Sequence, residues 1–400
     1  MRDRSILYAT AFLRALATGM CGVVLGLYLA ERQLDPVWIG AIVSAGLAGA
    51  AVASLGVTLN GDRLGRRHLL MALAGLAGVG GLAVASAGAP LVIAAAAFVG
   101  MLNGMGRDRG AAAVVEQAIL PATASPAERT RAFAWYTVCQ DAGHALGALC
   151  GGLPAWLQGL ASLAALPAYR ISLALPALLA LAALPLYRRL SSAIEAPAPA
   201  RGQPLSAASR RILWRIGGLF ALDSVGGGFL TSALLAYFFF ERFGVGPGTI
   251  GALFFAARVA NALSHLAAAR LAQRIGLLNT IVLTHIPSSL LLATLPWAPT
   301  FPIAVALFLL REGLVEMDVP TRQSYVMAVV RPEERLTAAG VTSLVRLGGW
   351  AVAPALAGVL MQTQSLATPL LVGAGLKIVY DGLLYFSFRL VRPPEEADGG

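Results

Sequence analysis

The chain has 400 residues, of which 58% are hydrophobic and only 12% are charged. Soluble domains carry about 25% charged residues, so this composition excludes an ordinary soluble protein and indicates an integral membrane protein. The net charge of +10 does not indicate nucleic-acid binding, because most arginines lie in short loops between apolar segments, where basic residues set topology.

Helices that cross a bilayer need about 20 apolar residues, and the sequence predicts an all-α membrane protein with twelve of them. No small-residue cleavage site follows the first segment, so we expect it to be retained as a membrane helix. Cys21, Cys139 and Cys150 lie inside apolar runs, and no disulfide is predicted. The predicted spans are residues 6–30, 37–60, 68–88, 91–120, 131–157, 168–187, 212–239, 248–272, 277–296, 301–329, 336–361 and 367–390.

One long polar stretch interrupts these spans. Residues 188–211 are rich in Pro, Ala and Ser and carry five arginines, which predicts a cytoplasmic linker between six-helix halves at 1–187 and 212–400. With both termini in the cytoplasm, the arginines left in outer loops are Arg32, Arg170 and Arg242, as the preference of basic residues for the cytoplasmic side requires.

The two halves repeat each other. An offset of 206 residues pairs Gln117 with Gln323 and Glu128 with Glu334, among other matches. Parallel six-helix repeats joined by a cytoplasmic linker are typical of secondary transporters.

The loop after the second span carries a basic motif with a single acid, Gly61-Asp62-Arg63-Leu64-Gly65-Arg66-Arg67. It resembles the Asp-Arg-x-Gly-Arg-Arg core of the major facilitator superfamily, and the resemblance covers the whole chain, with Thr58 in place of the usual preceding glycine. The resemblance implies two pseudo-symmetric six-helix bundles and an inner-side gate formed by Asp62, Arg63, Gly65, Arg66 and Arg67. Simple anchoring by the arginines remains an alternative, although it leaves Asp62 and Gly65 unexplained.

The fifth span contains closely spaced glycines, Gly143, Gly147, Gly151 and Gly152. This spacing is similar to the glycine-rich motif of the superfamily's antiporters and favours export. Close packing of helices through small residues is the alternative explanation.

Charges inside the spans are the candidate site, because a charge at the bilayer centre costs roughly 2.5–3.5 kcal/mol and normally faces a bundle interior. The tenth span holds the densest group. Glu312 and Glu316 lie four residues apart on one helical face, and so do Asp318 and Arg322. The opposite charges neutralise each other, whereas two neighbouring glutamates need a proton or a cation.

In the superfamily the first, fourth, seventh and tenth helices line the central cavity, and most of the intramembrane charges here fall on them or their neighbours. We expect Arg14 and Asp223 to pair, or to alternate partners, across the halves, and Lys377 and Asp381 to pair along the twelfth span. The predicted solute- or ion-binding residues are Arg14, Arg107, Asp108, Arg109, Asp141, Asp223, Arg258, Arg311, Glu312, Glu316, Asp318 and Arg322.

Several solute classes fit these residues. Arginines bind carboxylates and phosphates bidentately, which predicts a small polar solute, anionic or zwitterionic. Aromatic residues such as Phe229 and Tyr237 fit a lipophilic drug or metabolite efflux pump. Clustered acids and histidines fit a divalent-metal transporter, although no ligand spacing is distinctive. A purely structural charge network between helices stays open.

No Gly-x-x-x-x-Gly-Lys-Ser/Thr stretch exists, so the expected energy source is a gradient, and we predict proton coupling through Glu312, Glu316, Asp108 or Asp141. No cofactor and no resident metal are predicted. The expected partners are the lipid bilayer, a small-molecule solute and the coupling proton, for a monomer in a bacterial inner membrane. A membrane enzyme fits poorly because the acids lie deep within spans, and a non-transporting sensor is a further alternative.

Overall fold

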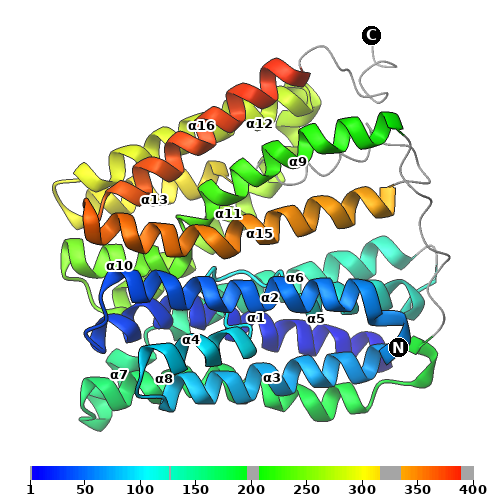
Figure 1. Cartoon of the computed structure of the whole chain (residues 1–400), viewed down its shortest axis with the longest axis horizontal. Helices are drawn as coiled ribbons and strands as arrows, with labels where there is room; N and C mark the ends of the chain where they lie inside the picture. The colour runs from blue at the N-terminus through cyan, green and yellow to red at the C-terminus, as the bar shows by residue number, and fades with distance from the viewer. Residues whose placement is uncertain (1, 126–127, 196–206, 316–334, 389–400) are drawn as a thin grey trace. The chain divides into compact units, whose positions relative to one another are not determined.

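The computed structural model describes residues 2–125, 128–195, 207–315 and 335–388, and within them the regular structure is helical (Figure 1). The chain forms two compact units. Unit 1 comprises residues 1–199, 230–255 and 354–366, and unit 2 comprises residues 200–229, 256–353 and 367–400. The predicted halves at 1–187 and 212–400 stay a prediction, since they were defined by the sequence repeat and not by contacts.

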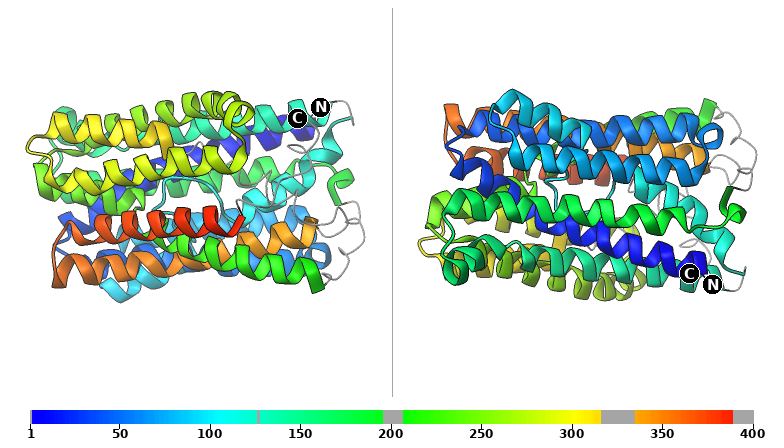
Figure 2. Two further views of the ribbon diagram at one scale, coloured as in Figure 1. Left: turned by 90° about the horizontal axis from the view of Figure 1, so that it is seen from above. Right: turned by 90° about the horizontal axis from the view of Figure 1, so that it is seen from below.

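Unit 1 contains most of the first half of the chain. Its α-helices are α1 (Arg2–Glu31), α2 (Pro36–Leu64), α3 (Arg66–Ser86), α4 (Pro90–Val99), α5 (Ala111–Ile119), α6 (Arg129–Cys150), α7 (Leu153–Ala161), α8 (Ala165–Arg188) and α10 (Ser232–Phe243). Short 3-10 helices η1 (Leu120–Thr123) and η3 (Ser192–Glu195) accompany them. α3 and α8 pack against each other, and they lie side by side in Figure 1 and in the right-hand view of Figure 2.

Unit 2 contains α9 (Ala207–Gly228), α12 (Leu277–Thr294), η4 (Leu295–Trp297), α13 (Phe301–Val315) and α16 (Thr368–Phe388). Two long helices, α11 (Pro247–Ile275) and α15 (Arg335–Thr363), contribute residues to both units. In unit 2 the apolar core joins α9, α12 and α16 through Phe220, Ile281, Tyr380 and their neighbours.

Local sequence signals explain several of the helix ends. The side chain of Asp35 accepts a hydrogen bond from the backbone N–H of Trp38, and Pro36 occupies the first turn, which together start α2. Thr231 caps α10 in the same way. Gly65, at φ 77°, makes the turn from α2 to α3, a backbone conformation that residues with a Cβ rarely adopt.

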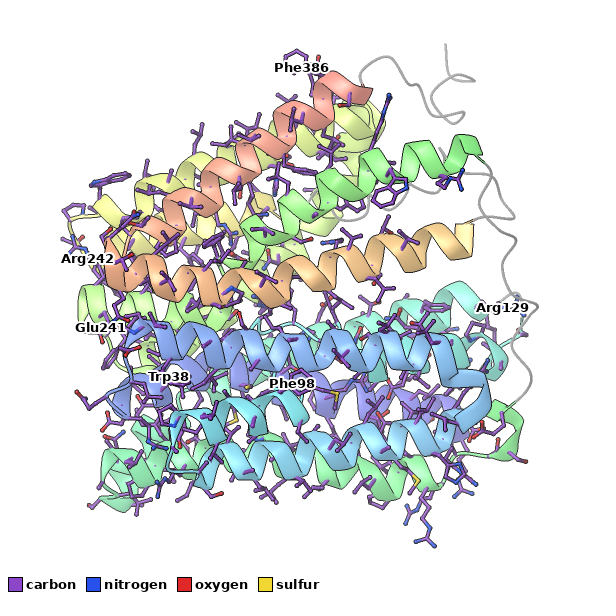
Figure 3. The ribbon with its side chains drawn as sticks, in the orientation of Figure 1. Trp38, Phe98, Arg129, Glu241, Arg242 and Phe386 are labelled. Carbon is purple, nitrogen blue, oxygen red and sulfur yellow. The ribbon has the colours of Figure 1, made fainter. Side chains whose placement is uncertain are left out.

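By length and composition, eight segments of the described residues could cross a membrane, and Pro90–Val99 and Ala111–Thr123 are shorter apolar helices. The total of twelve spans and the cytoplasmic position of the termini stay predictions. Large apolar side chains are exposed on many helices, including Phe98 and Phe386, which Figure 3 labels. Apolar surface of this extent is expected for a protein that faces lipid.

Three predicted spans are not the single helices that hydropathy suggested. The predicted span 91–120 is interrupted at residues 100–110, between α4 and α5. Span 131–157 turns at Gly151 and Gly152, between α6 and α7. Span 212–239 is interrupted after Gly228, between α9 and α10. Glycines supply the breaks, because each weakens a helix relative to alanine.

Two of the glycines predicted as an antiporter motif pack α6 against α1. A Cβ atom at Gly147 would lie 2.2 Å from the carbonyl oxygen of Leu16, and one at Gly143 would lie 2.7 Å from that of Phe12. The backbones are therefore too close for any larger residue. Small-residue packing accounts for both glycines, and export stays a prediction.

A second set of close backbone contacts lies within unit 1. Here α10 packs against α1 and the break at 100–110, and residues 354–366 pack against α2. We call this region the glycine seam. A Cβ at Gly26 would lie 2.1 Å from the carbonyl oxygen of Ala233, and one at Gly40 would lie 2.2 Å from that of Pro354. The contacts are backbone to backbone.

Neutral hydrogen bonds also cross the glycine seam. The backbone N–H of Ala233 donates to the carbonyl of Gly104 at 2.9 Å. The hydroxyl of Ser232 donates to the carbonyl of Met105 at 2.8 Å. Ser44 Oγ accepts from the backbone N–H of Ala355 at 2.8 Å. The seam thus joins segments of both predicted halves within one compact unit.

Candidate functional site

The break in the fourth predicted span places Asp108 inside unit 1. Asn103 holds the break together: its Nδ2 donates to the carbonyl of Arg107 at 2.7 Å, and its Oδ1 accepts from the N–H of Met105 at 2.8 Å. The backbone N–H of Asp108 donates to Nε2 of His144 on α6 at 2.8 Å. The carboxyl group of Asp108 is therefore carried by an ordered segment.

Arg14 on α1 lies at the centre of a polar network. Its Nε–H donates to Asp108 at 2.5 Å. Its two Nη groups donate to both oxygens of Glu116, at 2.8 and 2.9 Å, and to the hydroxyls of Tyr187 at 3.0 Å and Tyr136 at 3.1 Å. A guanidinium group has five N–H donors, and all five are used here. In this arrangement Arg14 has no donor left for a solute.

Glu116 on α5 is fully buried and accepts hydrogen bonds from several directions. Besides Arg14, the hydroxyls of Tyr187, Thr10 and Tyr136 donate to it at 2.6, 2.7 and 2.8 Å. Both carboxylate oxygens are therefore fully supplied with donors, as a buried charge requires. Glu116 is thus the fixed anionic partner of Arg14.

One guanidinium group therefore lies between two carboxyl groups. Both carboxyl groups form ion pairs with the single positive charge of Arg14, and Asp108 is the one that lines the cavity described next.

A cavity of about 130 Å³ opens beside this network, between α1, α3, α8 and the break. A single water molecule needs roughly 10–15 Å³ by the same measure, so the space holds several waters or part of a small solute. Its polar lining is Arg14, Thr18, Asn103, Asp108 and Tyr187, and the rest of the wall is mostly alanine, leucine and glycine.

In unit 2 the predicted cluster of the tenth span is only partly described. Arg311 forms a hydrogen-bonded ion pair with Glu312, and Asn261 on α11 donates to Glu312 at 2.8 Å. Both charges of the pair are buried, so the pair largely neutralises itself. The predicted residues Glu316, Asp318 and Arg322 lie outside the described residues.

Two predicted pairs are not formed in this structure, and an alternation of partners between Arg14 and Asp223 stays a prediction. Arg14 and Asp223 each find a partner within their own unit, since Asp223 on α9 accepts from Lys377 on α16 at 3.0 Å. Lys377 does not pair with Asp381, whose carboxylate contacts His285 on α12 instead. Spacing along one helix suggested the second pair, but the neighbouring helices offer each charge a closer partner.

The remaining predicted residues are dispersed. Arg107 and Arg109 are half-buried in the break beside Asp108, and Arg258 is half-buried on α11. Asp141 is exposed on α6 and is not part of the cavity lining. Of the predicted set, the structure brings Arg14 and Asp108 together at one cavity.

The predicted gate lies at the turn between α2 and α3. The carboxylate of Glu195 in η3 accepts from the backbone N–H of Arg66 at 2.7 Å and of Arg67 at 2.9 Å, which caps the first turn of α3. Arg66 also donates to the carbonyl of Ile194 at 3.1 Å. The side chains of Asp62 and Arg63 lie outside the described part, and gating stays a prediction.

The predicted binding residues do not include four members of the Arg14 network: Glu116, which the sequence shows only as one more charge of the fourth span, and Tyr136, Tyr187 and Thr10. Glu116 carried a usable signal, because it is an acid inside an apolar run, as Asp108 is. The two tyrosines carried none, since a tyrosine in an apolar segment is ordinarily a core residue.

Comparisons with known proteins agree with this architecture. The family model described as "Major Facilitator Superfamily" matches residues 7–354 and also 217–399. A protein of Saccharomyces cerevisiae described as uncharacterized membrane protein YJR124C is 25% identical over 421 residues, which cover 97% of this chain and 94% of the yeast protein.

Solved structures share the fold at low sequence identity. A nucleoside transporter, NupG, is 16% identical with a TM-score of 0.75, covering 97% of this chain and 100% of that one. A bacterial homolog of the human lysosomal transporter Spinster is 14% identical with a TM-score of 0.76, covering 96% of each chain. A D-xylose-proton symporter is 13% identical with a TM-score of 0.74, covering 95% of this chain and 97% of its own.

Proposed function

The chain belongs to the Major Facilitator Superfamily, and from this premise we propose that it exchanges a small polar solute for a proton by alternating access. It is a multi-pass membrane transporter and not an enzyme. In the proposal, residues 1–187 rock against residues 212–400 about the linker at 188–211, with both termini in the cytoplasm.

The observation that carries the proposal is the position of Asp108. Its carboxyl group lines the cavity and shares the single positive charge of Arg14 with Glu116, so that this network has two carboxyl groups for one guanidinium group. A proton can neutralise Asp108, and so can a cationic group of a solute. Two ligands that compete for one carboxylate cannot bind together, and this competition is what a proton/solute exchange requires.

The same contacts bear on the class of solute. A purely anionic solute at Arg14 would have to displace a carboxylate, because the N–H donors of Arg14 are all occupied. A zwitterionic solute can direct its cationic group to Asp108. A zwitterionic solute therefore has stronger support than an anionic one. The similar proteins of known structure do not narrow the choice of solute further.

A lipophilic drug or metabolite efflux pump is the second candidate. The observation in its favour is the mostly apolar wall of the cavity, which includes Leu73, Leu102, Leu179 and Met101.

We expect the protein to act as a monomer in a bacterial inner membrane, with the bilayer, the solute and the proton as its partners and with neither a cofactor nor nucleic acid. No observation specifically favours a divalent-metal transporter or a sensor.

The first test is a ligand screen of the detergent-solubilised protein by thermal shift at two pH values. Amino acids, nucleosides, carboxylates, lipophilic cations and divalent metals form the library, because a ligand of the folded state raises its apparent stability. We expect zwitterions to raise the melting temperature, and more strongly at the higher pH, where fewer protons compete. Hits confined to lipophilic compounds would favour the efflux pump instead.

A hit is then tested for transport in proteoliposomes with an imposed pH gradient. We expect the gradient to drive solute movement in the wild type, and we expect Asp108→Asn to lose this response while the folded protein persists. Glu128→Gln, which neutralises an exposed carboxylate, is the matched control and should behave as wild type. Transport that ignores a collapsed pH gradient would contradict proton exchange.

A further inference from the structure

Asp108 lies in a break where the backbone hydrogen bonds do not follow the helical pattern. In an α-helix each N–H donates to the carbonyl four residues earlier, which for Asp108 is the carbonyl of Gly104. Here that carbonyl accepts from the backbone N–H of Ala233 on α10 at 2.9 Å. The N–H of Asp108 donates instead to Nε2 of His144 on α6 at 2.8 Å. One helical hydrogen bond is thus replaced by two bonds to other helices.

The bond to Asp108 defines the protonation state of His144. A backbone N–H only donates, so Nε2 of His144 carries no proton in this arrangement. The proton of the neutral ring therefore lies on Nδ1. The side chain is buried, and the polar lining of the cavity does not include it. His144 thus acts on Asp108 through the backbone and not by contact with a solute.

Asp108 is held from two helices that touch each other. Its Oδ2 accepts from Nε–H of Arg14 on α1 at 2.5 Å, while its backbone N–H is held by His144 on α6. A Cβ at Gly19 of α1 would lie 2.4 Å from the backbone carbonyl oxygen of His144, so the two helix backbones are in contact at this level. The two groups that hold Asp108 therefore keep a constant separation as long as α1 and α6 stay packed.

The carboxyl group of Asp108 follows its backbone closely. Aspartate has two side-chain torsions, so a backbone that is held in place leaves few positions for the carboxyl group. Within the break, Oδ1 also accepts from the backbone N–H of Gly110, at 3.4 Å. The position of the acid at the cavity therefore depends on the backbone conformation of residue 108.

Loss of the acceptor on α6 would change that conformation. A backbone N–H that is shielded from water needs a partner, and leaving it unpaired is costly. The carbonyl of Gly104 is the partner that a helix offers, and a return to it would compete with the bond from Ala233. The dihedral angles of Asp108 would then differ, and its side chain would leave the backbone in another direction.

We propose that His144 is the residue that positions Asp108 for exchange. Its unprotonated Nε2 keeps the backbone N–H of Asp108 out of the helical pattern and so sets the carboxyl group against Arg14 and the cavity. This role rests on the proposed proton/solute exchange, which it deepens by naming the residue that places the exchanging acid. No covalent bond changes, and His144 exchanges no proton in this role.

Three substitutions separate the hydrogen bond from the volume of the ring. In His144→Gln the amide oxygen reaches about as far from the backbone as Nε2 does. In His144→Asn the same amide group ends one bond earlier, at the level of Nδ1, and His144→Leu fills the space without an acceptor. The matched control is His68→Asn, at an exposed histidine on α3.

The first measurement needs no solute. Hydrogen exchange of the Asp108 backbone amide is followed by NMR in the full chain in detergent, with ¹⁵N-labelled aspartate and with Asp108→Asn to assign the signal. We expect slow exchange in the wild type, in His144→Gln and in His68→Asn, and exchange about tenfold faster in His144→Asn and His144→Leu, as the loss of one hydrogen bond predicts. Equal rates in all of these proteins would overturn the proposal.

The ring itself is observed in the wild type with ¹⁵N-labelled histidine at neutral pH. The chain has four histidines, so His144→Gln assigns the signal by its disappearance. We expect a protonated Nδ1 and an unprotonated Nε2. A proton on Nε2, in the other tautomer or in the cation, would overturn the proposal, and this measurement is decisive even where a variant does not fold.

Transport then separates this proposal from the function on which it rests. In proteoliposomes, exchange driven by a pH gradient should persist in His144→Gln and fall about tenfold in His144→Asn and His144→Leu. Normal exchange in the last two variants would overturn the positioning role and leave proton exchange intact. A wild type without such exchange would refute the proposed function, whereas amide protection that follows the acceptor would still support the positioning of Asp108.

Discussion

At the residue scale, the Arg14 network separates two carboxyl groups that look equivalent in the sequence. Asp108 and Glu116 both lie in the fourth predicted span and both contact Arg14. Glu116 is fully buried among hydroxyl donors, whereas Asp108 lines the cavity. The first holds the guanidinium group among buried hydroxyl donors, and the second faces the cavity. Their substitution should therefore have different consequences.

We predict that Glu116→Gln destabilises the folded protein by about 3 kcal/mol or more, because removing one partner of a buried ion pair leaves the other uncompensated. The change would also leave the tyrosine hydroxyls without their anionic acceptor. The measurement is the free energy of unfolding in mixed detergent micelles. Glu128→Gln, at an exposed ion pair with Arg4, should change it by less than about 1 kcal/mol. Equal effects of the two substitutions would contradict the assigned role of Glu116.

The sequence indicated which charged residues lie inside the membrane spans more readily than it indicated their ion-pair partners. Arg14 and Asp108 stand out because a charge within an apolar span is costly and needs an explanation. Lys377 and Asp381 were paired because they are four residues apart, yet Lys377 bonds to Asp223 and Asp381 contacts His285. Partners on other helices depend on how the helices pack, and no spacing along the chain encodes that.

At the element scale, the fourth predicted span shows where hydropathy misleads. Its residues are apolar enough to suggest one continuous helix, but Gly100, Gly104, Gly106 and Gly110 lie within eleven residues. Gly106 has φ 70°, and Met101 also has a positive φ, of 51°. A hydropathy average over the segment does not reveal residues with positive φ. The close spacing of the glycines, by contrast, is a signal in the sequence that predicts the break.

We predict that Gly147→Ala destabilises the protein by about 1–3 kcal/mol, the usual cost of overpacking. The new methyl group would lie 2.2 Å from a carbonyl oxygen of α1, so α1 and α6 would have to move apart. The control is Gly75→Ala on α3, where a Cβ would meet nothing within 4 Å. That change should be neutral or slightly stabilising, because alanine favours a helix over glycine. Unfolding in detergent compares the two, and a neutral Gly147→Ala would refute close packing at this crossing.

At the scale of the whole molecule, the superfamily was predictable from the sequence, whereas the two compact units were not. The internal repeat, the basic loop motif and the apolar segments pointed to the family that the family model then identified. The units do not follow the repeat, because α10 and residues 354–366 pack within unit 1. A repeat in the sequence shows which segments correspond to each other, but it does not encode which helices of the two halves pack together.

We predict that Gly358→Leu opens the glycine seam. A Cβ at this position would already lie 2.2 Å from the carbonyl oxygen of Pro36, so a leucine side chain cannot be accommodated with the seam closed. The reporter is Cys21, which is buried and lines the cavity. In a background with Cys139→Ser and Cys150→Ser, a membrane-impermeant maleimide added from outside should label Cys21 several times faster in the variant.

The control for this labelling is Gly159→Leu on α7, where a Cβ would have nothing within 4 Å. This substitution introduces the same side chain without touching the seam and should leave the labelling rate of Cys21 unchanged. Equal rates in the two leucine variants would show that the seam does not control access to the cavity from that side.

The hydrogen bonds that the structure describes across the glycine seam join neutral groups, with backbone amides and a serine hydroxyl as donors. Dissolved ions screen interactions between exposed charges, most strongly beyond a Debye length of about 8 Å at physiological ionic strength, but they leave contacts between neutral groups largely unaffected. The balance between a closed and an open seam should therefore change little with the salinity of the medium. A cell whose surroundings range from dilute to salty water would keep the same resistance to leakage through this transporter.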